Sequence, residues 1–121
     1  MAFKVEENNG SPVLTPAWRT HDMAVPEPPV VANGVVFAIS SGEFTRQIKE
    51  DGSLYTAKER EQKSTGNATL YAFDAQTGEE LFSSGKTMQS FTHMGGLAVS
   101  NGRIFATTHD NVLYAFHVKP Q

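Results

Sequence analysis

The stretch NATLYAFDAQTGEELF, residues 67–82, contains a tetrapeptide, LYAF, that returns unchanged at residues 113–116. A second repeated pair, NGVVFAIS from Asn33 and NGRIFATT from Asn101, precedes the two copies of LYAF. A shortened third copy, MAFKV, stands at residues 1–5. Internal repetition of this kind indicates that one supersecondary unit recurs along the chain and that neighbouring units stack on each other.

Each unit is predicted to consist of short strands. Asn33 and Gly34 separate two β-rich runs, and both residue types tolerate the positive φ angles of a tight hairpin turn. Asp110 and Asn111 occupy the tip of a similar hairpin, while Gly78 suits a left-handed turn before a fourth strand. Four short antiparallel strands per unit are typical of a propeller blade. We therefore expect an all-β fold of antiparallel four-stranded β-propeller blades.

The repeat boundaries predict three segments. Residues 1–27 would form the end of a preceding blade, and residues 28–85 would form one blade with an insertion at about 42–67. Residues 86–121 would form a final blade that lacks its outer strand. The chain would then be a partial propeller of about two blades.

The insertion is the most charged part of the sequence. Within it, LYTAKEREQK at residues 54–63 has a helix-forming composition, and Ser53 could cap a short helix. We expect a decorated loop that holds this helix.

The segment AFDAQTGEELF resembles the tryptophan-docking motif of quinoprotein-type, PQQ-like β-propellers, Ala-x-Asp-x-x-x-Gly-(Lys or Glu)-x-x-Trp. The match includes Ala72, Asp74 and Gly78, with Phe82 in place of the tryptophan. The resemblance implies that these residues fasten blades together: the alanine packs below a neighbouring tryptophan, and the aspartate caps the turn that the glycine permits. Trp18 is the tryptophan of the first copy.

Both end copies depart from this motif. The first copy has Lys4 where the aspartate would stand, and the last has His117 there. The departures leave the docking at the two ends of the chain open.

The resemblance favours a non-catalytic scaffold or binding module without a cofactor. Quinoprotein dehydrogenases use pyrroloquinoline quinone with calcium, a tryptophan floor and often a vicinal cysteine pair, whereas this chain has one Trp and no Cys. The expected partner is another protein, the remaining blades of a parent propeller, or further copies of this chain in a homo-oligomer. The alternative is a fragment of a PQQ-dependent dehydrogenase.

Composition sets further limits. With 39% apolar residues, 19% charged residues and a net charge of −3, the sequence is typical of a folded globular chain. The scattered basic residues argue against a nucleic-acid partner, and no apolar run is long enough to predict a transmembrane segment. The family resemblance implies a periplasmic or extracellular location, although the N-terminal residues do not resemble a signal peptide.

The histidines are the remaining candidates for chemistry. His93 and His109 fall in the same unit, where they could pair as metal ligands, or His109 and Asp110 could form an acid-base couple. Neither spacing is a recognised metal signature. We interpret Asp110 as part of a turn and both histidines as polar rim residues, and we keep the three as ligand candidates.

Overall fold

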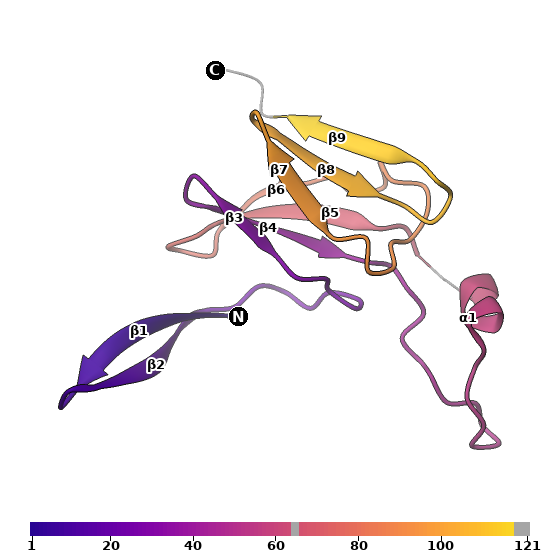
Figure 1. Cartoon of the computed structure of the whole chain (residues 1–121), viewed down its shortest axis with the longest axis horizontal. Coiled ribbons are helices and arrows are strands. Elements are labelled where there is room, and N and C mark those ends of the chain that lie inside the picture. Colours follow the sequence, from indigo (N-terminus) through magenta and orange to yellow (C-terminus); the bar gives the residue numbers. More distant parts are fainter. Residues whose placement is uncertain (64–65, 118–121) are drawn as a thin grey trace.

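The computed structural model describes residues 1–63 and 66–117, and within them the chain forms antiparallel β-sheets and one short helix. The expected all-β class is confirmed. Figure 1 shows a hairpin at one end, two sheets stacked in the middle and helix α1 (Ala57–Lys63) at the opposite end.

The strands form three sheets. The first sheet is the hairpin β1 (Ala2–Asn8) and β2 (Ser11–Trp18). The second sheet has the order β3 (Val30–Ala32), β4 (Val35–Ser40), β5 (Thr69–Asp74), β6 (Glu80–Ser83). The third has the order β7 (Leu97–Ser100), β8 (Arg103–Thr107), β9 (Leu113–His117).

Asparagine and glycine close the hairpins. Asn33 and Gly34 have φ angles of 50° and 75° between β3 and β4, the positive values that were expected from the sequence. Asn111 has φ 64° at the tip of the β8–β9 hairpin, which is also as expected. The pair Asn9 and Gly10, whose role was not anticipated, closes β1–β2 in the same way.

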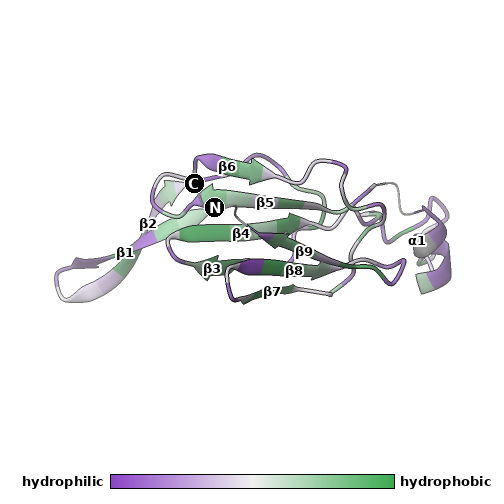
Figure 2. Ribbon diagram, turned by 90° about the horizontal axis from the view of Figure 1, so that it is seen from above, coloured by the Kyte–Doolittle hydropathy of each residue, from purple (hydrophilic) through white to green (hydrophobic). Residues whose placement is uncertain are grey.

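The core lies between the second and third sheets. Ile39 of β4 and Leu70 of β5 pair directly and are almost completely buried. They pack with Ile104 and Ala106 of β8 and with Met88 of the connection between the sheets. Figure 2 shows hydrophobic residues concentrated along β4, β5 and β8, whereas the loops and α1 are largely hydrophilic.

The helix in the insertion is confirmed, but its expected cap is wrong. The backbone N–H and hydroxyl of Thr56 both donate to Glu59 Oε2, at 2.8 and 2.9 Å, and the Glu59 N–H donates back to Thr56 Oγ1 at 3.2 Å. This is a reciprocal capping box, which satisfies donors at the helix start. Ser53 instead donates its hydroxyl to Asp51 Oδ1 at 2.7 Å in the preceding turn.

Candidate functional site

The first sheet contacts the second through Trp18, at the end of β2. The indole Nε1–H donates to the backbone carbonyl of Ala75 at 3.1 Å. The ring packs against Gly78, where an added Cβ would lie 2.6 Å from Trp18 Cδ2. Gly78 also has φ 75°. Both the backbone conformation and the neighbouring indole therefore require glycine at this position.

The turn that receives Trp18 is organised by Asp74. Its Oδ1 accepts hydrogen bonds from the backbone N–H groups of Gln76 and Thr77, at 2.9 and 2.8 Å, and from the Thr77 hydroxyl at 3.0 Å. The pKa of Asp74 is lowered, chiefly because the Thr77 backbone donates to the carboxylate, with the Thr77 hydroxyl and the Gln76 backbone adding to the effect. The ionised carboxylate therefore stabilises the turn.

Ala72 and Phe82 lie on the other side of the second sheet from Trp18. They are paired across β5 and β6, and both line a cavity of about 330 Å³ between the second and third sheets. The Phe82 ring lies edge-on to Phe116 of β9, with 6.1 Å between centroids. Thus the structure brings Trp18, Asp74 and Gly78 together, whereas Ala72 and Phe82 face the next sheet.

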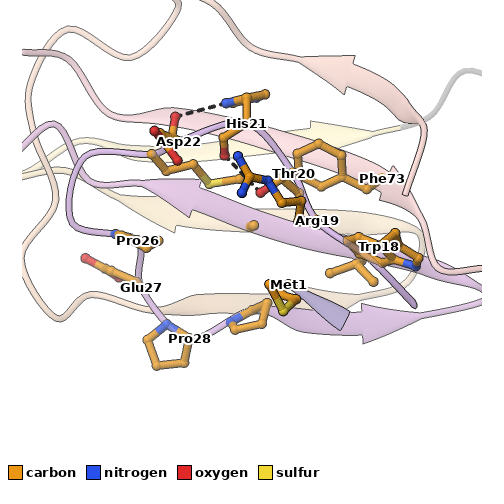
Figure 3. A pocket seen from close by; sticks show the side chains of 14 residues that line it. Met1, Trp18, Arg19, Thr20, His21, Asp22, Pro26, Glu27, Pro28 and Phe73 are labelled. Carbon is orange, nitrogen blue, oxygen red and sulfur yellow. Dashed lines mark hydrogen bonds between the residues drawn. The ribbon is translucent and has the colours of Figure 1, made fainter. Parts of the chain in front are cut away.

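The segment after Trp18 crosses the outer face of β4 and β5 and leaves a cavity of about 810 Å³ there (Figure 3). Phe73 lies in the floor of this cavity. His21 stands edge-on to Tyr71 at 4.7 Å between centroids, and its Nε2 is 3.2 Å from Glu80 Oε2. This face of the second sheet is therefore only partly covered.

Glu27 fastens that segment to the third sheet. The residue is buried, and its Oε2 accepts a hydrogen bond from the Gly96 backbone at 2.7 Å. Its Oε1 has no partner among the described residues. The contact joins the residues before β3 to those before β7.

The structure brings His93 and His109 to one small cavity of about 120 Å³. His93 Nδ1 lies 3.0 Å from Glu43 Oε2. The His109 ring stacks on Phe91, with 4.6 Å between centroids and 13° between planes. Asp110 does not line this cavity; its Oδ1 accepts a hydrogen bond from Thr108 Oγ1 at 2.5 Å in the adjacent turn.

Two residues of this cavity were missed from the sequence. Glu43 follows β4 and is buried, and Arg60 of α1 donates from Nη2 to Glu43 Oε1. The composition of LYTAKEREQK predicts a short helix, but nothing local indicates that Arg60 reaches a carboxylate 17 positions earlier. The insertion thus supplies half of the cavity wall.

The described residues include no group of three or more His, Cys, Asp or Glu side chains placed to hold a metal ion. Nor does the described part of the chain contain a helix with the length and apolar character needed to cross a bilayer. In comparisons with known proteins, no family model, curated protein or solved structure matches this chain significantly.

Proposed function

We propose that this chain is a non-catalytic part of a PQQ-like β-propeller, a scaffold of stacked blades whose partners are further blades of the same kind. The observation that carries the proposal is the Trp18 junction, in which the indole of one sheet docks on the turn between two strands of the next. The same resemblance makes a periplasmic or extracellular location part of the proposal.

The hairpin supports the proposal because it presents an apolar face that none of the described residues covers. Val5 pairs with Leu14, and Phe3 pairs with Pro16, so these four side chains share one face. Phe3, Val5 and Leu14 are 50%, 74% and 67% exposed. An apolar sheet face of this kind is stable when another layer of secondary structure packs against it.

The third sheet, at the C-terminal side of the described residues, also supports the proposal. Among the described residues β9 pairs only with β8, which leaves one strand edge open. Unpaired backbone groups on such an edge are a template for another strand. Leu113, on the outer face of β9, is 63% exposed. We propose that strands of a second copy, or of a parent protein, cover this sheet.

The test is the mass of the purified chain, measured by light scattering coupled to size exclusion. We expect a mass of several times 13.2 kDa, or aggregation. The proposed contact, in which strands of one copy cover the third sheet of the next, is head-to-tail, so the copies can close into a ring or extend into a fibre. Leu113→Lys should reduce the mass, whereas Gln62→Lys, an equal charge change on the exposed side of α1, should not. A monomer peak with cooperative unfolding for the unmodified chain would contradict the proposal.

The alternative, a fragment of a PQQ-dependent dehydrogenase, has less support. Its quinone would need a tryptophan floor, but the single Trp of the chain is held by Ala75 and Gly78 at the junction. Tight, calcium-dependent binding of PQQ in equilibrium dialysis would reverse this preference.

A further inference from the structure

The apolar cavity between the second and third sheets is large enough to hold a small molecule. Its volume is about 330 Å³, which lies within the range of about 300–1,000 Å³ that is usual for ligand pockets. An engineered apolar cavity of about 150 Å³ is sufficient to bind benzene. The space between the sheets is therefore sufficient for an aromatic ring with a short substituent.

The walls of this cavity are almost entirely apolar. Leu70 and Ala72 of β5 line it from the second sheet, and Ile104 of β8 lines it from the third. All three residues are at most 7% exposed. No lysine, arginine, aspartate or glutamate is among the described residues that line the cavity. A strongly charged ligand would therefore lose its hydration there without gaining an ion-pair partner among those four residue types.

Three phenyl rings line the cavity and favour an aromatic occupant. Phe37 of β4 and Phe116 of β9 pack against the core from the two sheets. Phe82 of β6 lies edge-on to Phe116, with 6.1 Å between centroids. Aromatic rings attract one another in edge-on and offset arrangements more strongly than their buried area alone predicts. A further ring between these side chains would gain such contacts.

The polar groups of the lining lie at one end of the cavity. They belong to Asn33 and Gly102, in the β3–β4 and β7–β8 turns, and to His117, the last residue of β9. Both turns and the end of β9 lie at the same end of the stacked sheets (Figure 1). Asn33 and His117 are exposed, so this end offers a route from solvent and hydrogen-bonding groups for a polar substituent.

We propose that this cavity binds a small uncharged aromatic molecule of the phenol class, with its ring among the three phenylalanines and its hydroxyl group beside Asn33 and His117. The binding free energy comes from burial of the ring and from dispersion contacts with wall atoms that otherwise face empty space. The walls all belong to one chain, so the proposal does not depend on the scaffold function or on association between copies.

The test is a titration of the whole chain with p-cresol, followed by NMR of the side-chain methyl groups. p-Cresol is uncharged at neutral pH, as the tyrosine side chain is. We expect saturable shifts at Val99 and Ile104, which line the cavity, and none at Leu14, an exposed residue of the hairpin. 4-Methylbenzoate, which has a similar ring with a charged group, should bind at least tenfold more weakly.

Three results would overturn the proposal. Shifts that do not saturate would show that no defined site exists. Equal shifts at Leu14 and Ile104 would show general adsorption to apolar surface. Equal affinity for 4-methylbenzoate would show that the site does not select an uncharged ligand.

Variants then assign the site. Phe82→Trp places a larger ring in the cavity and should weaken p-cresol binding at least tenfold, whereas Leu81→Trp, at the neighbouring exposed position of β6, should leave it unchanged. Val99→Phe narrows the cavity from the third sheet and should also weaken binding, which provides a second test if the new indole turns outward. Unchanged affinity in both Phe82→Trp and Val99→Phe would exclude this cavity as the site.

Discussion

The tetrapeptide LYAF occurs in β5 and in β9, and its two copies have different surroundings. In β5, Leu70 is 1% exposed and packs against the third sheet. In β9, Leu113 is 63% exposed, while Tyr114 and Phe116 turn inward and pack against the same core. In each copy the leucine faces away from the preceding sheet, so its burial depends on whether another sheet follows.

This comparison shows that a repeated sequence specifies which way each side chain faces but not whether that face is covered. Strand alternation sends Leu70 and Phe73 to opposite faces of the second sheet. The third sheet covers Leu70, and the segment after Trp18 covers Phe73 in part. For β9 the described residues provide a neighbour on one face only.

The largest expected difference between the copies is in the cost of removing their leucines. Leu70→Ala should lower the free energy of unfolding by about 2–5 kcal/mol, because it leaves a cavity in the core. Leu113→Ala should change it by no more than about 0.5 kcal/mol in the unassociated chain, because that side chain is exposed. Urea unfolding at low protein concentration measures both, and equal losses would contradict the assigned faces.

The next effect concerns the turn that follows LYAF in the first copy. Gly78→Ala should destabilise by about 2–4 kcal/mol, because positive φ is strained for alanine and the new Cβ would collide with the Trp18 ring. Gly102→Ala is the matched control, since Gly102 has φ 69° and open space around its Cα. It should cost about 1 kcal/mol. Thermal melts that rank Gly102 as the more sensitive site would contradict the packing described for Trp18.

A smaller effect, which raises stability instead of lowering it, is expected at Phe82 of β6, whose ring lies against Phe116 of the second LYAF copy. Phe82→Trp should stabilise by about 1 kcal/mol, because a larger ring at this position fills part of the cavity of about 330 Å³ that Phe82 and Phe116 line. Leu81→Trp, at the neighbouring exposed position of β6, should not stabilise. Chemical denaturation of both variants makes the comparison, and a loss of stability in Phe82→Trp would show that the cavity cannot accept an indole.

The smallest effect is on the pH dependence of stability, and it concerns Asp74, which follows LYAF in the first copy where His117 follows it in the second. Asp74 has a folded pKa below its ordinary value of 3.8, so its contribution to stability is present above pH 3.8 and is lost as the pH falls through the folded value. Asp74→Asn should therefore weaken the dependence of stability on pH below about pH 4. Asp22→Asn, at an exposed position outside the turn, controls for the lost charge. An unchanged pH profile in Asp74→Asn would mean that the carboxylate does not stabilise the turn.

Local features of the sequence were sufficient to predict most of the strands and turns. The β3–β4 hairpin is one example. It depends only on residues adjacent in sequence, the Asn-Gly pair at Asn33 and the β-rich runs on each side of it. The helix position was also readable, but its cap was misassigned to Ser53, although Thr56 with Glu59 three residues later is the stronger capping pattern.

The small polar cavity could be predicted only in part. His93 and His109 were expected in one unit because both lie in the second copy of the repeat. Their neighbours Glu43 and Arg60 come from the insertion, and Glu43 is 50 positions from His93. The path of the insertion depends on tertiary contacts. No repeat or spacing in the sequence therefore indicates that Glu43 and Arg60 lie beside the two histidines.

The junction at Trp18 has one more consequence, which follows from its being the single tryptophan of the chain. The indole emission of this protein comes from one position, where the first sheet meets the second. Detachment of the hairpin would expose that ring to water while the core around Leu70 stayed folded. The protein therefore carries its own optical probe of hairpin docking, and a red shift in emission that precedes the loss of β-structure would separate undocking from unfolding.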